Sequence, residues 1–354
     1  MKKRTMNGAG RFLGTVLLCG GVVSSCSNDI DEPASKGPEV LATPYITKVL
    51  EFVPCPGQFV NVLPEFEEGD TQEAMNEKVL QLIGNNKRGL ISLGGFGGYV
   101  VVGFDHTIEN KPGSRDFRVL GNAFNGNSSA AVSGATKGGS YEPGIILVAY
   151  DKNGNGKPDA DEWYEIQGSA QQKGYREPWY VEAECAGNDV NCYADYEITY
   201  YKPQSEPSTP EEDEKYIRWT DNKGGEGYIP KNEYHRQPYF PQWIQSDKLT
   251  FKGTRLPQNA INRGTEAAPY FVLFSFAYGY ADNALNDSEG AAIDIDWAVD
   301  ANGAAVHLPG VDFVKIYYCC PIKSIAYKKS CSAIVYSMAE SCFVILSPCQ
   351  KIDS

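Results

Sequence analysis

The feature that most constrains this chain is a polar segment of twelve residues, 151–162, that separates two short apolar runs. Side-chain oxygens fall at its first, third, fifth, ninth and twelfth positions, and Gly156 stands at the sixth, where the chain must turn sharply. These are the positions from which a calcium-binding loop supplies its ligands, with a backbone carbonyl at the seventh. The spacing therefore predicts one calcium ion, held by Asp151, Asn153, Asn155, Lys157 (through its carbonyl), Asp159 and Glu162.

The runs on either side of this segment indicate strands rather than the helices of an EF-hand. Residues 145–150 and 163–166 are short and rich in β-branched and aromatic side chains. A calcium ion between two strands would clamp a β-structure, so the role we predict for it is structural and not catalytic. The alternative is an Asn-Gly hairpin turn without metal, which would leave Asp159 and Glu162 without a purpose.

The rest of the chain predicts an all-β fold, a β-sandwich or jelly roll in a single domain over residues 45–317. One helix is expected near residues 71–83, with Asp70 or Thr71 as its N-cap and Gly84 at its end. The glycine-rich residues 94–98 precede a strand and not a helix, so they predict a turn and no phosphate site. Further strands are expected at residues 45–59, 90–93, 99–104, 117–120, 194–201, 248–251, 270–278, 292–299 and 311–317.

The N-terminus predicts export and a lipid anchor. Residues 1–25 combine four basic residues with a short apolar core, as a signal peptide does, and Val23-Ser24-Ser25-Cys26 resembles the lipobox of bacterial lipoproteins. Lipidation of Cys26 would follow cleavage, and the polar, acidic residues 26–44 would form a disordered tether. The expected location is the outer membrane, facing the cell surface, with the protein held there by its N-terminal lipid.

The charge of the chain argues against nucleic acid as a partner. The formal net charge is −13, and removal of the four positive charges of residues 1–25, which hold no acidic residue, lowers it to −17. Such a chain repels polyanions and tolerates divalent cations.

Residues 219–243 hold many aromatic side chains without a regular pattern. One interpretation is a ligand platform that includes Trp219, Tyr239 and Trp243, because exposed aromatic rings stack on sugars or flat cofactors. The other is a loop packed on its own aromatic side chains. Both stay open at this point.

Catalytic motifs are missing: there is no nucleophile elbow, Walker A loop or His-Glu-x-x-His sequence. We therefore predict no catalytic residues and no enzymatic activity. Along residues 292–299, alternation would place Asp294 and Asp296 on one face and Ile293, Ile295 and Trp297 on the other. Such a carboxylate pair could act as the acid and base of a glycoside hydrolase, which is the least favoured of the functions considered for this chain.

The ten cysteines fall into groups. Cys185 and Cys192 flank a short loop and are predicted to form a disulfide in an oxidising compartment. Cys55 has no evident partner. Five others lie in residues 318–354, a tail that lacks the turn chemistry of the preceding domain.

Several blocks together resemble a family of Bacteroidetes cell surface proteins, some of them described as PKD-domain proteins. The blocks are residues 94–106, Glu142-Pro143-Gly144 with the loop after it, 219–222, 253–257, 280–283, 297–300 and 307–313. The resemblance covers about residues 45–317 and ends before the cysteine-rich tail. It implies a surface lipoprotein encoded beside a TonB-dependent receptor, in some cases with cobalamin uptake components.

These observations predict a calcium-stabilised lipoprotein that binds a nutrient for TonB-dependent uptake, the ligand being a small molecule such as cobalamin or a glycan. The alternative, from another class, is a surface adhesin or a carbohydrate-binding structural protein that transports nothing.

Overall fold

The computed structural model describes residues 42–126, 138–265, 268–320, 341–342 and 345–348. The predicted signal peptide, Cys26 and the tether up to residue 41 lie outside the described residues, as does most of the cysteine-rich tail. Every strand pair described is antiparallel, and the predicted all-β fold is confirmed.

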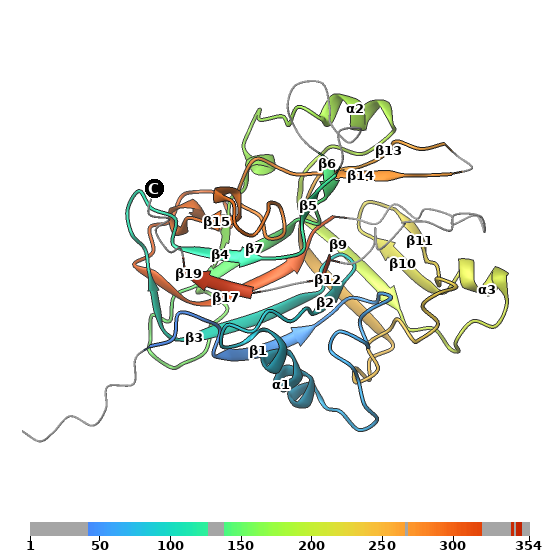
Figure 1. Ribbon diagram of the computed structural model, residues 1–354, viewed down its shortest axis with the longest axis horizontal. Coiled ribbons are helices and arrows are strands. Elements are labelled where there is room, and N and C mark those ends of the chain that lie inside the picture. The colour runs from blue at the N-terminus through green and yellow to red at the C-terminus, as the bar shows by residue number, and fades with distance from the viewer. Residues whose placement is uncertain (1–41, 127–137, 266–267, 321–340, 343–344, 349–354) are drawn as a thin grey trace, which may run out of the picture. The chain divides into compact units, whose positions relative to one another are not determined.

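A six-stranded sheet forms the centre of the domain (Figure 1). In spatial order its strands are β1 (Lys48–Val53), β3 (Tyr99–Glu109), β17 (Gly310–Tyr318), β7 (Gly144–Ala149), β8 (Trp163–Ile166) and β16 (Ala298–Val299).

Two four-stranded sheets and two smaller sheets complete the fold. The first runs β11 (Glu226–Ile229), β10 (Ile217–Asp221), β9 (Tyr193–Tyr201), β12 (Lys248–Arg255). The second runs β13 (Ala260–Asn262), β14 (Phe271–Phe274), β6 (Gly138–Ser140), β5 (Phe124–Asn125). The three-stranded sheet runs β15 (Ala292–Ile293), β4 (Phe117–Leu120), β19 (Ile345–Pro348). The two-stranded sheet pairs β18 (Ser341–Cys342) with β2 (Ser92–Gly94). Two strands of the tail thus pair with strands of the domain.

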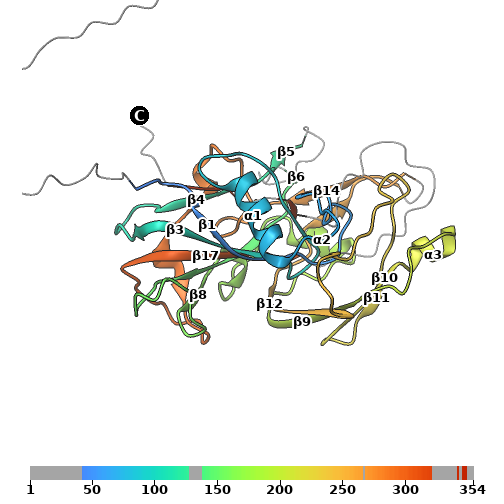
Figure 2. The same ribbon diagram turned by 90° about the horizontal axis from the view of Figure 1, so that it is seen from below.

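The central sheet is apolar on both faces because it lies between two hydrophobic clusters. On β7, Ile146 and Val148 point into one cluster, whereas Ile145 and Leu147 contact the other. This alternation explains why residues 145–149 form an unbroken apolar run, as strands buried on both sides do. The second cluster is shared with β9 and β12, which lie to one side of the central sheet in Figure 2.

The helix α1 (Gln72–Ile83) covers the first cluster and has the predicted ends. The Thr71 side chain accepts a hydrogen bond from the amide of Ala74, and Gly84 is the C-cap. Met75, Val79 and Ile83 face the cluster, beside β1 (Figure 1).

Other helical segments are short, and the sequence did not predict them. They are α2 (Tyr180–Cys185), α3 (Pro210–Glu214) and the 3₁₀ turns Ser169–Gln171, Glu289–Ala291 and Ile295–Trp297. Within the described ranges, no helix combines the length and the apolar character that a bilayer span requires.

The prediction of one continuous strand at residues 292–299 is wrong. Ala292 and Ile293 pair with β4, whereas Ala298 and Val299 pair with β8 in the central sheet. Between them a 3₁₀ turn is capped by Asp294, whose carboxylate accepts from the amide of Asp296. The segment therefore crosses from one sheet to another, and the predicted face with two carboxylates does not form.

The predicted glycine-rich turn at residues 94–98 is confirmed, and it is tightly packed. The amide of Gly97 donates to the carbonyl of Tyr318 at 2.8 Å. A β-carbon at Gly97 would lie 2.1 Å from Cβ of Phe251, and one at Gly98 would lie 1.8 Å from the carbonyl oxygen of Leu93. No side chain fits at either position.

Candidate functional site

The polar segment 151–162 joins β7 to β8, two neighbouring antiparallel strands of the central sheet. Ala149, two residues before the segment, pairs with Trp163, the residue directly after it. The two strands predicted on either side are confirmed, and the loop closes a hairpin between them.

The first half of this loop folds around Asp151. Its carboxylate accepts hydrogen bonds from the amide of Asn155 at 3.1 Å and from that of Gly156 at 2.7 Å. Asn153 also accepts from the amide of Asn155, and Asn155 accepts from the amide of Lys157. Gly156 has a φ of 76°, the left-handed conformation that the sixth position requires.

The second half is fixed by Glu162, which is 2 % exposed. One carboxylate oxygen accepts from the amide of Lys152 at 2.9 Å, and the other accepts from the amide of Asp159 at 3.0 Å. The last residue of the loop thus holds backbone from both of its halves.

Asp159 completes the contacts among the predicted ligands. Its carboxylate accepts from the side-chain amides of Asn153 at 2.7 Å and Asn155 at 2.9 Å. All six predicted ligand residues are therefore joined in one network of direct hydrogen bonds.

The donor set of the loop fits calcium in its chemistry, because every predicted ligand atom is an oxygen. In this structure N–H groups of the loop occupy the carboxylates of Asp151, Asp159 and Glu162. Over the described ranges, no three His, Cys, Asp or Glu side chains are grouped closely enough to hold a metal ion. Binding of calcium through the Asp159 oxygen that Asn153 and Asn155 share would displace these two side-chain amides.

The aromatic residues predicted to line a ligand site occupy different places. Trp243 is 7 % exposed in the first hydrophobic cluster, where its ring stacks on Phe52 with 5.8 Å between centroids. Tyr239 is 2 % exposed in the second cluster, and Trp219 packs against that cluster from β10. The stretch also contains the β10–β11 hairpin. These are positions of packed residues rather than of an exposed platform.

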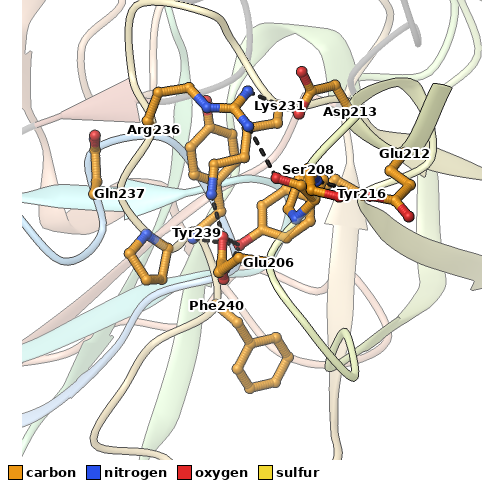
Figure 3. Close-up of polar contacts among 12 residues, drawn as sticks. Glu206, Ser208, Glu212, Asp213, Tyr216, Lys231, Arg236, Gln237, Tyr239 and Phe240 are labelled. Atoms are coloured by element: carbon orange, nitrogen blue, oxygen red, sulfur yellow. Dashed lines mark hydrogen bonds and ion pairs between the residues drawn. The ribbon is translucent and has the colours of Figure 1, made fainter. Parts of the chain in front are cut away.

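A buried lysine that no sequence motif marks lies within this aromatic stretch (Figure 3). The Lys231 side chain is 1 % exposed and forms an ion pair with Glu206. Its ammonium lies 4.5 Å from the ring centroid of Tyr216 and 5.4 Å from that of Tyr239. The Tyr216 hydroxyl donates to the same carboxylate, at 2.6 Å to one oxygen. The ammonium is thus held by one carboxylate and two aromatic rings.

This cluster connects segments that are distant in sequence. The amide of Lys231 donates to the carbonyl of Asp213, and Arg236 forms an ion pair of 2.7 Å with the Asp213 carboxylate. Residues 203–213 are thereby joined to residues 231–240. No spacing rule predicts such a contact, and the only sequence signal is a lysine among many tyrosines.

The cysteines predicted to be bridged are free thiols in this structure. Cys185 ends α2 and is exposed, whereas Cys192 packs against the second hydrophobic cluster. Burial raises the pKa of the Cys192 thiol to about 12, so it is protonated and unreactive at neutral pH. Their side chains thus face different surroundings, and closeness in sequence does not bring them together here.

One further acid, Asp282, is buried and incompletely bonded. It is 5 % exposed, and its Oδ1 accepts from the amide of Ala123 at 2.7 Å. Its Oδ2 makes no hydrogen bond in the part of the chain that the structure describes. Burial raises the pKa of Asp282 to about 7.

Neither a protein-family model nor a curated protein matches this chain.

Proposed function

We propose that the protein is a lipid-anchored protein of the outer-membrane surface whose β-structure is clamped by calcium and which binds a ligand for TonB-dependent uptake. The observation that supports this most directly is the loop at residues 151–162. Its predicted ligand residues contact one another at the junction of two central strands. The ligand we propose is a small molecule such as cobalamin, or a glycan.

The expected effect of calcium follows from the charges of the loop. Asp151, Asp159 and Glu162 bring three carboxylates into one hairpin, and their mutual repulsion opposes closure. A cation bound to the folded state stabilises it by RT ln(1 + [L]/Kd). Extracellular modules bind calcium at about 10⁻⁴–10⁻³ M, so millimolar calcium would contribute on the order of 1 kcal/mol.

The anchor and the uptake role rest on the sequence. The Val-Ser-Ser-Cys motif supports lipidation of Cys26, and the resemblance to Bacteroidetes surface proteins supports a TonB-dependent receptor as partner. An acidic chain of predominantly β-structure is compatible with both.

The calcium site is tested by thermal unfolding in EGTA, in excess calcium and in excess magnesium. We expect a rise in Tm with calcium and little with magnesium, which demands a smaller octahedral shell. The rise should vanish in Asp151→Ala and persist in Asp161→Asn, a control that removes an exposed carboxylate outside the predicted ligand set. Equal melting of the wild type in EGTA and calcium would show that the loop is only a turn.

The uptake role is tested by calorimetry with cobalamins and with a panel of soluble glycans. Saturable binding of one of these would support a ligand-binding accessory. Binding confined to immobilised matrix proteins or host surfaces would instead indicate an adhesin and would overturn the uptake proposal.

A further inference from the structure

An aspartate outside the loop holds its first residue. The carboxylate of Asp312, on β17, accepts a hydrogen bond from the amide of Asp151 at 2.8 Å. Its other oxygen accepts from the hydroxyl of Thr107, on β3, at 2.5 Å. The half-buried Asp312 therefore connects the loop to β17, which is next to β7 in the central sheet, and to β3 on the far side of β17.

The pairing of β17 with β3 is irregular at this residue. Val311 pairs with Ile108, but Phe313 pairs with Gly103, so the register shifts where Asp312 lies. On its other side β17 remains regular, with Phe313 paired to Ala149 at the end of β7. Irregularities of this kind redirect side chains in a sheet. Here the redirected carboxylate meets the residue that begins the loop.

From these contacts we infer that Asp312, oriented by Thr107, is a positioning residue of the calcium loop. This inference rests on the proposed calcium site. Asp312 fixes the backbone of Asp151, and the Asp151 carboxylate organises the first half of the loop through Asn155 and Gly156. Loss of the Asp312 contacts would leave the first ligand free to move, and the loop would then bind calcium more weakly.

Asp312 acts in this scheme through Asp151 and not as a ligand. It lies outside the twelve-residue segment that supplies the predicted ligands, and its contact with the loop is the hydrogen bond from the amide of Asp151. Groups that orient metal ligands affect affinity strongly, typically by about 10–100-fold when they are removed.

The test compares calcium affinity, measured by titration calorimetry on the full mature chain, among matched variants. Asp312→Ala removes both hydrogen bonds and should weaken binding by about 10-fold or more. Asp312→Asn removes the charge but can keep both bonds. Its carbonyl can accept from Asp151, and its amide can donate to the Thr107 hydroxyl, which is both donor and acceptor. We expect its affinity to stay within about threefold of the wild type.

Thr107 supplies a second, milder pair of variants. Thr107→Val removes the hydroxyl at nearly constant shape and should weaken calcium binding, whereas Thr107→Ser should restore it. This pair decides the question if Asp312→Ala fails to fold. A purely structural role for Asp312 would lower the Tm in EGTA but would leave the calcium affinity of the folded protein unchanged.

The outcomes separate the two proposals. Absence of calcium binding by the wild type would overturn the calcium site and the inference with it. Normal binding by the wild type, Asp312→Ala and Thr107→Val would overturn the positioning role alone. Equal losses in Asp312→Ala and Asp312→Asn would assign the effect to the charge of Asp312 and would also overturn it.

Discussion

Asp282 carries a carboxyl group whose ionisation opposes folding. Burial raises its pKa from 3.8 to about 7, so the folded state holds a proton that the unfolded state releases. Stability should therefore fall as the pH rises from about 4 to about 7, and the full penalty applies above pH 7. A shift of this size corresponds to about 4 kcal/mol as an upper bound.

We predict that Asp282→Asn gains stability relative to the wild type when the pH is raised from 5 to 8, by up to about 2–3 kcal/mol. Denaturant unfolding at both pH values measures the difference. Asp287→Asn, at an exposed position nearby, is the control, and a pH-independent difference for Asp282→Asn would contradict the prediction.

Trp243 should behave as a core residue. It packs on Phe52 and Phe66, and its indole N–H donates to the side chain of Gln72 at 3.2 Å. We predict that Trp243→Ala lowers the free energy of unfolding by about 3–5 kcal/mol. Tyr234→Ala, in the same stretch but 70 % exposed, should change it by less than about 0.5 kcal/mol. Near-equal stabilities in urea would restore Trp243 as a candidate ligand contact.

At the scale of elements, the Lys231–Glu206 ion pair joins residues 203–213 to residues 231–240. The two partners differ in exposure: the Lys231 side chain is 1 % exposed and that of Glu206 is 45 %. Removal of the carboxylate leaves a buried ammonium without its counter-charge. Removal of the ammonium leaves a carboxylate that water can reach.

We therefore predict an asymmetry between the two variants. Glu206→Ala should cost about 3 kcal/mol, whereas Lys231→Met, which keeps the volume and the contact with Tyr216 and Tyr239, should cost much less. Urea unfolding of both variants measures the two costs. A larger cost for Lys231→Met than for Glu206→Ala would contradict the prediction that the buried ammonium depends on the carboxylate.

The elements that sequence could predict are those governed by local chemistry. The helix at 71–83 follows from its cap and its apolar spacing, and strand 163–166 follows from its composition. The strand at 292–299 was predicted from alternation, but its two ends pair with different sheets, which no local pattern encodes. For the same reason the pattern predicts ligands within the loop but gives no sign of Asp312, which is near the loop only after β17 pairs with β7.

At the scale of the whole molecule, the predicted lipid anchor sets where the β-domain works. We predict that growth with a labelled fatty acid marks the wild-type protein and that Cys26→Ala abolishes the label. One acylated N-terminus with several chains holds a protein to a membrane without a spanning helix. Cys185→Ala, which alters an exposed thiol, should keep the label. Label that persists in Cys26→Ala would place the anchor elsewhere.

The turn at residues 94–98 also predicts which residues evolutionary relatives of this chain should share. It leads into β3, and Gly97 touches β12, so a side chain there would push apart strands from two sheets. Surface positions can drift freely over evolutionary time, but Gly97 and Gly98 tolerate no β-carbon without rearrangement of their neighbours. Distant kin of this chain should therefore keep these two glycines after most other likeness has been lost, and the pair would serve as the fixed point from which to align them.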